Sequence, residues 1–141
     1  MLSYTIEEIK VGDKGSIEKT VSESDVYNFA GITGDFSWLH VNEDRSRRGR
    51  FGKRIVHGML LMGMISGVLG TQMPGGGCIY VSQEIKFLKP VFIGDTVKAE
   101  VEVVEVIKER NRVKLKTVCT NQNGEEVLVG EATMIPTLSK E

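Results

Sequence analysis

The spacing of the apolar residues changes along this chain, and the change predicts where helices and strands lie. Between His57 and about Gln72 apolar side chains fall on every face of a helix, which predicts a helix buried on all sides. They are Met59, Leu60, Leu61, Met62, Met64, Ile65, Val68 and Leu69. Gly63, Gly67 and Gly70 form a stripe among them. Because each glycine costs a helix roughly 1 kcal/mol relative to alanine, the stripe indicates that another backbone approaches closely.

A shorter amphipathic helix is predicted over residues 23–32. Its apolar side recurs at spacings of three and four, at Val26, Phe29, Ala30 and Thr33. Ser22 stands at the N-cap position and Asp25 follows three residues later, which resembles a capping box with Asp in place of the usual Glu or Gln. Gly34 is expected to end this helix.

After the long helix the spacing becomes that of strands. Alternating or apolar segments occupy residues 78–88, 97–103, 113–119 and 125–135, and a short strand is predicted over 16–21. Asn123-Gly124 is a hairpin signal, and the slip in parity at Val103-Val104 indicates a bulge. The predicted class is α+β, an antiparallel sheet wrapped around one central apolar helix. The exposed edges of such a sheet also favour the pairing of two copies.

Composition narrows the possible functions. The 141 residues predict a single domain over 1–141. The net charge of −1 gives no electrostatic basis for a nucleic-acid or membrane partner. Cys78 and Cys119 stand far apart in no CxxC pattern, so we expect neither a disulfide framework nor a zinc site. The N-terminus has no signal-peptide pattern, and residues 59–69 fall short of the roughly 20 needed to span a bilayer. A cytoplasmic location is therefore expected.

Candidate chemistry begins at Asp35 and His40, an acid and an imidazole five residues apart. Neither a regular helix nor a strand would bring side chains at this spacing together. They can converge only if residues 36–39 make an irregular bend. The alternative is an ordinary loop that carries a surface Asp and a surface His. His57 is expected to be a partly buried structural histidine at the start of the long helix.

A basic run occupies residues 45–54, RSRRGRFGKR, with six basic side chains and two glycines. Such side chains bind phosphate oxygens through charge-assisted hydrogen bonds. The run fits equally a solvated loop that is balanced by Glu43 and Asp44. Both interpretations stay open at this point.

Several motifs together resemble the MaoC-like, (R)-specific enoyl-CoA hydratase branch of the hot-dog fold, over roughly residues 12–135. They are Asp35-x4-His40, Ile55-Val56-His57-Gly58-Met59-Leu60, Ser66-Gly67-x-Leu69-Gly70 and the block from Ile79 to Thr96. The chain departs from the family at Trp38, where the usual residue is a proline that would stiffen the bend. Tryptophan could stiffen the bend by packing, or it could reshape the acyl site.

The resemblance implies a homodimer or a higher homo-oligomer that converts trans-2-enoyl-CoA and water to (R)-3-hydroxyacyl-CoA reversibly. It implies that Asp35 and His40 form the catalytic pair, that the Gly58 N–H lies in an oxyanion hole, and that Ser66 adds a supporting hydrogen bond. No metal or other cofactor is expected. The basic side chains that are candidates to contact the CoA phosphates are Arg47, Arg48, Arg50 and Lys53.

Hydration of an enoyl thioester requires three functions that these residues could supply. A base must deprotonate water as it attacks C3, an acid must protonate C2, and the thioester oxygen must be stabilised as it gains negative charge. An acyl-CoA thioesterase is one alternative, although residues 59–71 contain no carboxylate. A non-catalytic acyl-CoA-binding subunit is another. The acyl-chain length stays open. The pathway also stays open between polyhydroxyalkanoate supply, fatty-acid metabolism and a fermentation route.

Overall fold

A computed structural model describes residues 1–140. Its strands form one antiparallel sheet in the order β1-β3-β4-β5-β2. They are β1 (Lys14–Thr20), β2 (Ile79–Phe87), β3 (Thr96–Ile107), β4 (Arg112–Thr120) and β5 (Glu126–Ile135). The α-helices are α1 (Glu23–Thr33), α2 (Trp38–Val41), α3 (Glu43–Arg47) and α4 (Gly58–Thr71), and a 3-10 turn spans Lys108–Arg110.

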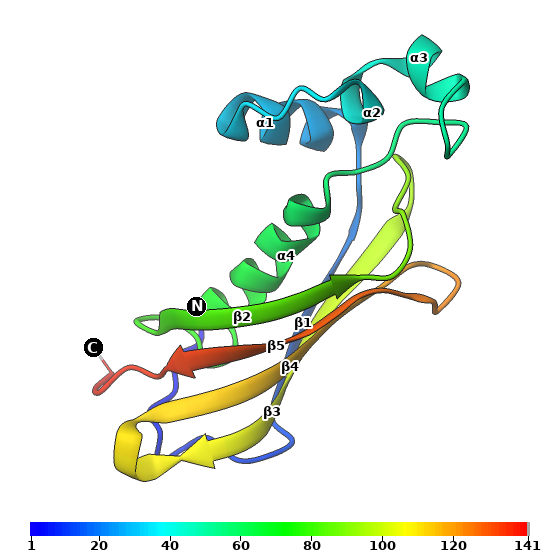
Figure 1. Ribbon diagram of the computed structural model, residues 1–141. Helices are drawn as coiled ribbons and strands as arrows, with labels where there is room; N and C mark the ends of the chain where they lie inside the picture. Colours follow the sequence, from blue (N-terminus) through cyan, green and yellow to red (C-terminus); the bar gives the residue numbers. More distant parts are fainter. Residues whose placement is uncertain (141) are drawn as a thin grey trace.

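The elements form two parts, which Figure 1 shows. Helix α4 lies along one face of the sheet and packs against β1, β3 and β4. Helices α1, α2 and α3 lie beyond the end of α4 where it begins. We call residues 23–57, which contain these three helices, the cap. Within the described residues, 1–140, no helix is both long and apolar enough to cross a membrane.

The strands follow the predicted alternation. In β4 the side chains that are fully buried are Val113, Leu115, Thr117 and Cys119, every second residue. The register of β3 against β4 shifts between Val103 and Glu105, which confirms the predicted bulge. Gly124, in the turn between β4 and β5, has a φ of 74°. That left-handed conformation favours glycine, so the hairpin signal is confirmed as well.

Helix α4 differs from its prediction. One side is buried in the core, and its members are Leu61, Met62, Met64, Ile65, Val68 and Leu69. The other side is exposed, at Met59 (56% exposed), Gly63, Ser66 and Gly67. The prediction of a helix buried on all sides is therefore wrong for one copy of the chain. The reason is geometric, because one sheet can cover only one side of a helix.

Helix α1 begins and ends as its sequence predicts. The Asp25 N–H donates to Ser22 Oγ at 3.0 Å, and the Ser22 N–H donates to Asp25 Oδ2 at 2.9 Å. This reciprocal pair is a complete capping box. Gly34 ends the helix with a φ of 81°, and its N–H donates to the Ala30 carbonyl at 2.8 Å. Asp35 therefore begins the irregular part of the cap.

Candidate functional site

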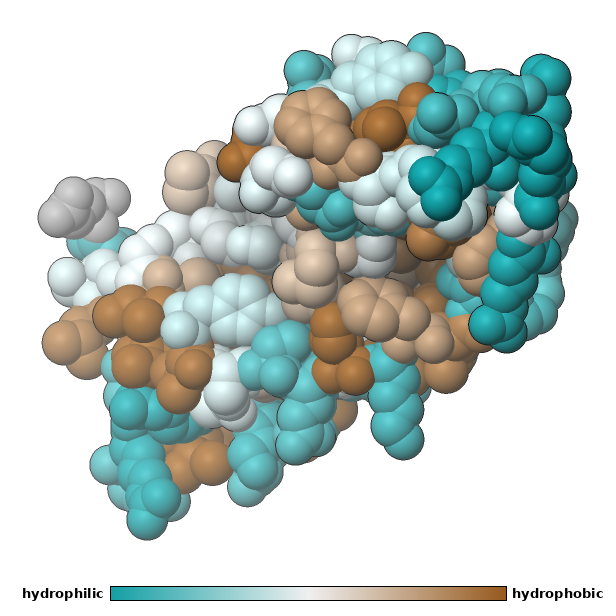
Figure 2. All heavy atoms as spheres, turned by 45° about the horizontal axis from the view of Figure 1, so that its top comes forward, coloured by the Kyte–Doolittle hydropathy of each residue, from teal (hydrophilic) through white to brown (hydrophobic). Residues whose placement is uncertain are grey.

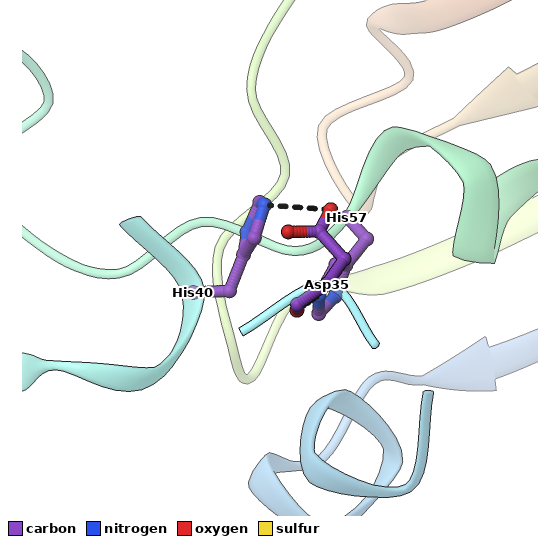
Figure 3. A group of neighbouring side chains, drawn as sticks. All are labelled: Asp35, His40 and His57. Carbon is purple, nitrogen blue, oxygen red and sulfur yellow. Dashed lines mark hydrogen bonds and ion pairs between the residues drawn. The ribbon is translucent and has the colours of Figure 1, made fainter. Parts of the chain in front are cut away.

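Asp35 and His40 face each other across the bend that the sequence requires (Figure 3). Asp35 lies in residues 34–37, which have no regular secondary structure, and His40 lies in the one-turn helix α2. Asp35 Oδ2 is 3.9 Å from His40 Nε2. The Asp35 side chain is 51% exposed and that of His40 is 11% exposed. The pair therefore joins a solvent-accessible carboxylate to a largely buried imidazole.

Backbone contacts fix the roles of the nitrogens in His40. Its Nδ1 lies 2.7 Å from the carbonyl oxygen of Ile55. Because a carbonyl oxygen only accepts hydrogen bonds, Nδ1 carries a proton and donates it. In the neutral ring the lone pair is therefore on Nε2, the nitrogen that faces Asp35. This nitrogen can take up a proton without any rotation of the ring.

The carboxylate of Asp35 is oriented by the turn around it. The Ser37 N–H donates to Asp35 Oδ1 at 3.2 Å, and the Asp35 N–H donates to Thr33 Oγ1 at 3.2 Å. The first of these is the local side-chain-to-backbone bond by which Asp stabilises turns. It occupies Oδ1 and leaves Oδ2 directed at His40.

His57 is the residue whose role differs most from its sequence interpretation. It is 2% exposed, and its ring stacks on His40 with the ring centroids 3.8 Å apart. Its Nε2 lies 2.9 Å from the carbonyl oxygen of Asp35. The residue thus contacts both members of the pair. In the sequence, His57 was marked by its position directly before the long helix and by the motif from Ile55 to Leu60.

Three ligand-type side chains therefore meet here, since atoms of Asp35, His40 and His57 lie within 4.8 Å of one another. Their geometry does not suit a metal ion. Ring nitrogens hold their lone pairs in the plane of the ring, and the two imidazole planes are only 25° apart. Lone pairs in stacked rings point side by side and cannot converge on one ion at about 2.0–2.1 Å. The arrangement suits proton transfer instead.

Gly58 opens α4 beside a cleft of about 530 Å³. The cleft is lined by Arg50, Phe51, Ile55, Val56, Gly58, Met59, Leu61, Phe87, Leu88, Lys89, Pro90 and Val91. A Cβ atom on Gly58 would lie 2.5 Å from Phe87 Cε1, so a larger residue there would require the exposed Phe87 ring to move. The N–H of Gly58 belongs to the first turn of a helix, where amides have no partner within the helix.

Ser66 lines a second cavity of about 650 Å³, together with Gly63, Tyr80 and Gln83. Met59 lines both cavities, so the two adjoin along α4. The walls are mostly apolar, and the Tyr80 hydroxyl donates to Gln83 Oε1. Burial raises the pKa of Tyr80 to about 12, so its phenol stays neutral. Asp35 and His40 line neither cavity, but His40 bonds the carbonyl of Ile55, a residue that lines the first.

Trp38 packs against residues of α3 and the loop that follows it. Its ring lies 4.6 Å from the guanidinium carbon of Arg45, and a Cβ on Gly49 would lie 3.1 Å from Trp38 Cζ3. The buried Ser46 hydroxyl donates to the Trp38 carbonyl at 3.0 Å. These contacts join α2 to α3. Trp38 lines neither of the two cavities described above.

The basic run separates into structural and exposed members. Arg54 is 11% exposed and pairs with Glu23 at 2.9 Å and with Glu43 at 2.8 Å, which ties α1 to α3. The hydrogen bond from Arg54 lowers the pKa of Glu23. Arg48, which directly follows α3, pairs with Asp44 of that helix at 2.9 Å. Figure 2 shows the exposed part of the run as a hydrophilic cluster at the right edge, where α3 lies in Figure 1.

The four candidates for phosphate contact are therefore not equivalent. Arg47 and Arg48 lie near carboxylates of α3, with the Arg47 Nε 3.9 Å from Glu43. The Lys53 ammonium lies 4.2 Å from the centre of the Phe92 ring. Arg50 alone among the four lines the cleft at Gly58. It is therefore the candidate whose position suits a ligand in that cleft.

Known proteins resemble this chain over nearly its whole length. The family model for the MaoC like domain matches residues 7–125. An (R)-specific enoyl-CoA hydratase of Rhodospirillum rubrum is 49% identical over 96% of this chain and 94% of its own length. A 3-hydroxybutyryl-CoA dehydratase of Methylorubrum extorquens is 44% identical over 96% of this chain and 85% of its own.

Solved structures agree with the sequence relatives. The unliganded R-hydratase of Pseudomonas aeruginosa superposes with a TM-score of 0.92 at 35% identity, covering 97% of this chain and 88% of its own. An (R)-hydratase of A. caviae involved in PHA biosynthesis gives a TM-score of 0.88 at 38% identity, covering 91% and 97%. These matches confirm the predicted fold class and the family resemblance. The chain belongs to the MaoC-like domain family of hot-dog proteins.

Proposed function

We propose that this protein is an enzyme that adds water reversibly to trans-2-enoyl-CoA and forms (R)-3-hydroxyacyl-CoA. The observation that carries the proposal is the separation of 3.9 Å between Asp35 Oδ2 and His40 Nε2. The pair lies against His57, the residue directly before α4. The names of the relatives, (R)-specific enoyl-CoA hydratase and 3-hydroxybutyryl-CoA dehydratase, support the same reaction.

The spacing of the pair suits one water molecule. For a water oxygen about 2.8 Å from both Asp35 Oδ2 and His40 Nε2, the angle at the water between these two atoms would be about 90°. The pair removes a proton from this water as its oxygen bonds to C3. The electrons of the C2–C3 double bond then move toward the thioester oxygen, and C2 takes a proton from the pair. One proton enters the pair and one leaves it, so the step is balanced without any cofactor.

The start of α4 supplies the third requirement. The N–H groups of the first helical turn point out of the helix, and the helix dipole favours an anion there. The Gly58 N–H is the donor proposed for the thioester oxygen, in the cleft that also contains Arg50. An oxyanion donor of this kind is typically worth about 2.7–4 kcal/mol of transition-state stabilisation. Ser66, in the adjoining cavity, is proposed as a supporting donor.

A second copy of the chain is the proposed partner. The uncovered side of α4 adjoins the edge strand β2, where the exposed apolar residues are Ile79, Tyr80, Val81 and Phe87. A Cβ on Gly63, Gly67 or Gly70 would meet no atom within 4 Å in residues 1–140. The stripe thus leaves room for another backbone. Sedimentation should accordingly give at least twice the chain mass of 15.6 kDa.

A hydration assay tests the proposed function. Crotonyl-CoA and longer trans-2-enoyl-CoA esters should lose their conjugated absorbance, and the product should be the (R)-3-hydroxyacyl ester. Release of free CoA thiol from saturated acyl-CoA is the control reaction, because it would indicate a thioesterase. Tight binding of the esters without turnover, or thiol release in place of hydration, would refute the proposal.

A further inference from the structure

His57 contacts both members of the proposed catalytic pair through different parts of one ring. Its Nε2 lies 2.9 Å from the carbonyl oxygen of Asp35, and its face stacks on His40 at a centroid distance of 3.8 Å. A third contact comes from Phe29, whose ring lies tilted at 4.8 Å. Figure 3 shows His57 beside Asp35 and His40. His57 is therefore enclosed by the pair and α1, and is 2% exposed.

The contact with Asp35 matters because the backbone there is irregular. The other hydrogen bonds of Asp35 reach only to Thr33 and Ser37, two residues away on either side. His57 provides a bond across 22 residues of sequence. Without it, residues 34–37 would be held by local turn contacts only, and the carboxylate could move relative to His40.

The contact with His40 is one of several that residues 55–58 make with the site. The Ile55 carbonyl accepts from His40 Nδ1 at 2.7 Å, and the Ile55 N–H donates to the Leu39 carbonyl at 3.0 Å. Two residues later the ring of His57 covers the face of His40. Gly58 then begins α4. Residues 55–58 thus contact the imidazole of His40 and the backbone of Asp35, and they also carry the proposed oxyanion donor.

The protonation of His57 indicates that its N–H, and not only its bulk, is used. Because the Asp35 carbonyl can only accept, His57 Nε2 carries the proton, and Nδ1 is the acceptor of the neutral ring. That Nδ1 is buried and has no hydrogen-bond partner among residues 1–140. An unpartnered buried polar atom lowers stability, and an apolar side chain would not carry this cost. A residue that serves packing alone would not need this nitrogen.

We propose that His57 is a positioning residue, which aligns Asp35 with His40 by a hydrogen bond to the first and by stacking on the second. This inference rests on the proposed function, and it adds a residue that acts through the pair without touching the reacting atoms. Small errors in the placement of catalytic groups reduce rates strongly. His57 therefore acts on kcat, while the binding of the CoA ester depends on other surfaces.

Two substitutions separate the two contacts. His57→Phe keeps an aromatic ring against His40 and removes the bond to the Asp35 carbonyl. His57→Gln keeps a donor in the position of Nε2 and removes the stacked ring. Each should lower kcat for crotonyl-CoA hydration by about 10- to 100-fold, with KM changed by less than about twofold. Unchanged kcat in both variants, or a raised KM with kcat unchanged, would contradict the proposal.

Val101→Ala is the matched control, because it also alters a buried side chain but lies in β3, away from the cap. It should lower the melting temperature and leave kcat unchanged. Asp35→Asn separates this inference from the proposed function. If Asp35→Asn is as active as the wild type, the proposed function fails. If Asp35→Asn is inactive while both His57 variants are fully active, only the role of His57 fails.

Nitrogen-15 NMR of the unmodified protein provides a second test that requires no variant to fold. The chain contains only two histidines, so its ring signals can be assigned by comparison. In the neutral state His57 should be protonated on Nε2 and His40 on Nδ1. A His57 ring protonated on Nδ1 could not donate to Asp35, and that result would overturn the proposal.

Discussion

Different interactions stabilise the two parts of the molecule, the cap on the one hand and the sheet with α4 on the other. In the sheet, backbone ladders join every pair of neighbouring strands, and alternate side chains such as those of Val113 and Leu115 are fully buried. In the cap, single side chains bond to single carbonyls, as His40 does to Ile55 and His57 to Asp35. The first part depends on the sum of many similar contacts. The second depends on a few specific ones, so one substitution there can alter chemistry without unfolding the protein.

The largest expected effect on stability lies in the sheet. Leu115 is fully buried in β4, and Leu115→Ala should lower the free energy of unfolding by about 2–5 kcal/mol because it leaves a cavity. Chemical denaturation measures the change. The kcat of the folded fraction should stay at the wild-type value. A loss of kcat without a loss of stability would contradict the division in which the sheet determines stability and the cap determines the chemistry.

Gly58 lies where the two parts meet. Gly58→Ala keeps the N–H but places a methyl group beside the proposed position of the thioester oxygen. It should lower kcat by up to about 10²- to 10³-fold, the loss that follows removal of one oxyanion donor. The same methyl group would also strike Phe87, 2.5 Å away. The double variant Gly58→Ala/Phe87→Leu removes that second collision. Steady-state kinetics of the double variant should still show the low kcat. Full recovery would mean that Gly58 serves packing alone.

The smallest expected effect concerns the basic run. Arg50 lines the cleft, whereas Arg48 pairs with Asp44 on α3. Arg50→Glu should raise KM for the CoA ester by about two- to fivefold, as expected for an exposed charge contact, and leave kcat nearly unchanged. Arg48→Glu is the comparison, with a smaller change in KM. Equal KM values for both variants and the wild type would exclude this surface from CoA binding.

The fold could be predicted from the sequence wherever one local pattern decides the structure. The alternation at Val113–Cys119, the slip after Val103 and the capping box at Ser22 each reproduce a regular geometry, and each matches the structure. The exposure of α4 could not be predicted in this way. The apolar residues of a helix reveal that it must be covered, but they do not reveal whether its own chain or a second one covers it.

The site was predictable only in part. The spacing of Asp35 and His40 indicated that a bend over residues 36–39 was needed for them to meet. The structure brings them together through an irregular segment at residues 34–37, and residues 38–39 already belong to α2. The stacking of His57 on His40 could not be predicted from the sequence, because it depends on how two residues 17 positions apart are brought together by the fold. The division of the basic run was equally hidden. Whether Arg54 pairs with α1 or faces a ligand is decided by tertiary placement and leaves no local pattern.

The central claim is that Asp35 and His40 together move the protons of hydration. The most direct measurement is crotonyl-CoA hydration by Asp35→Asn and His40→Ala, with the melting temperature of each variant recorded alongside. We predict that each variant folds and that its kcat falls by about 10²- to 10⁴-fold. Two folded variants that keep the wild-type rate would contradict the account.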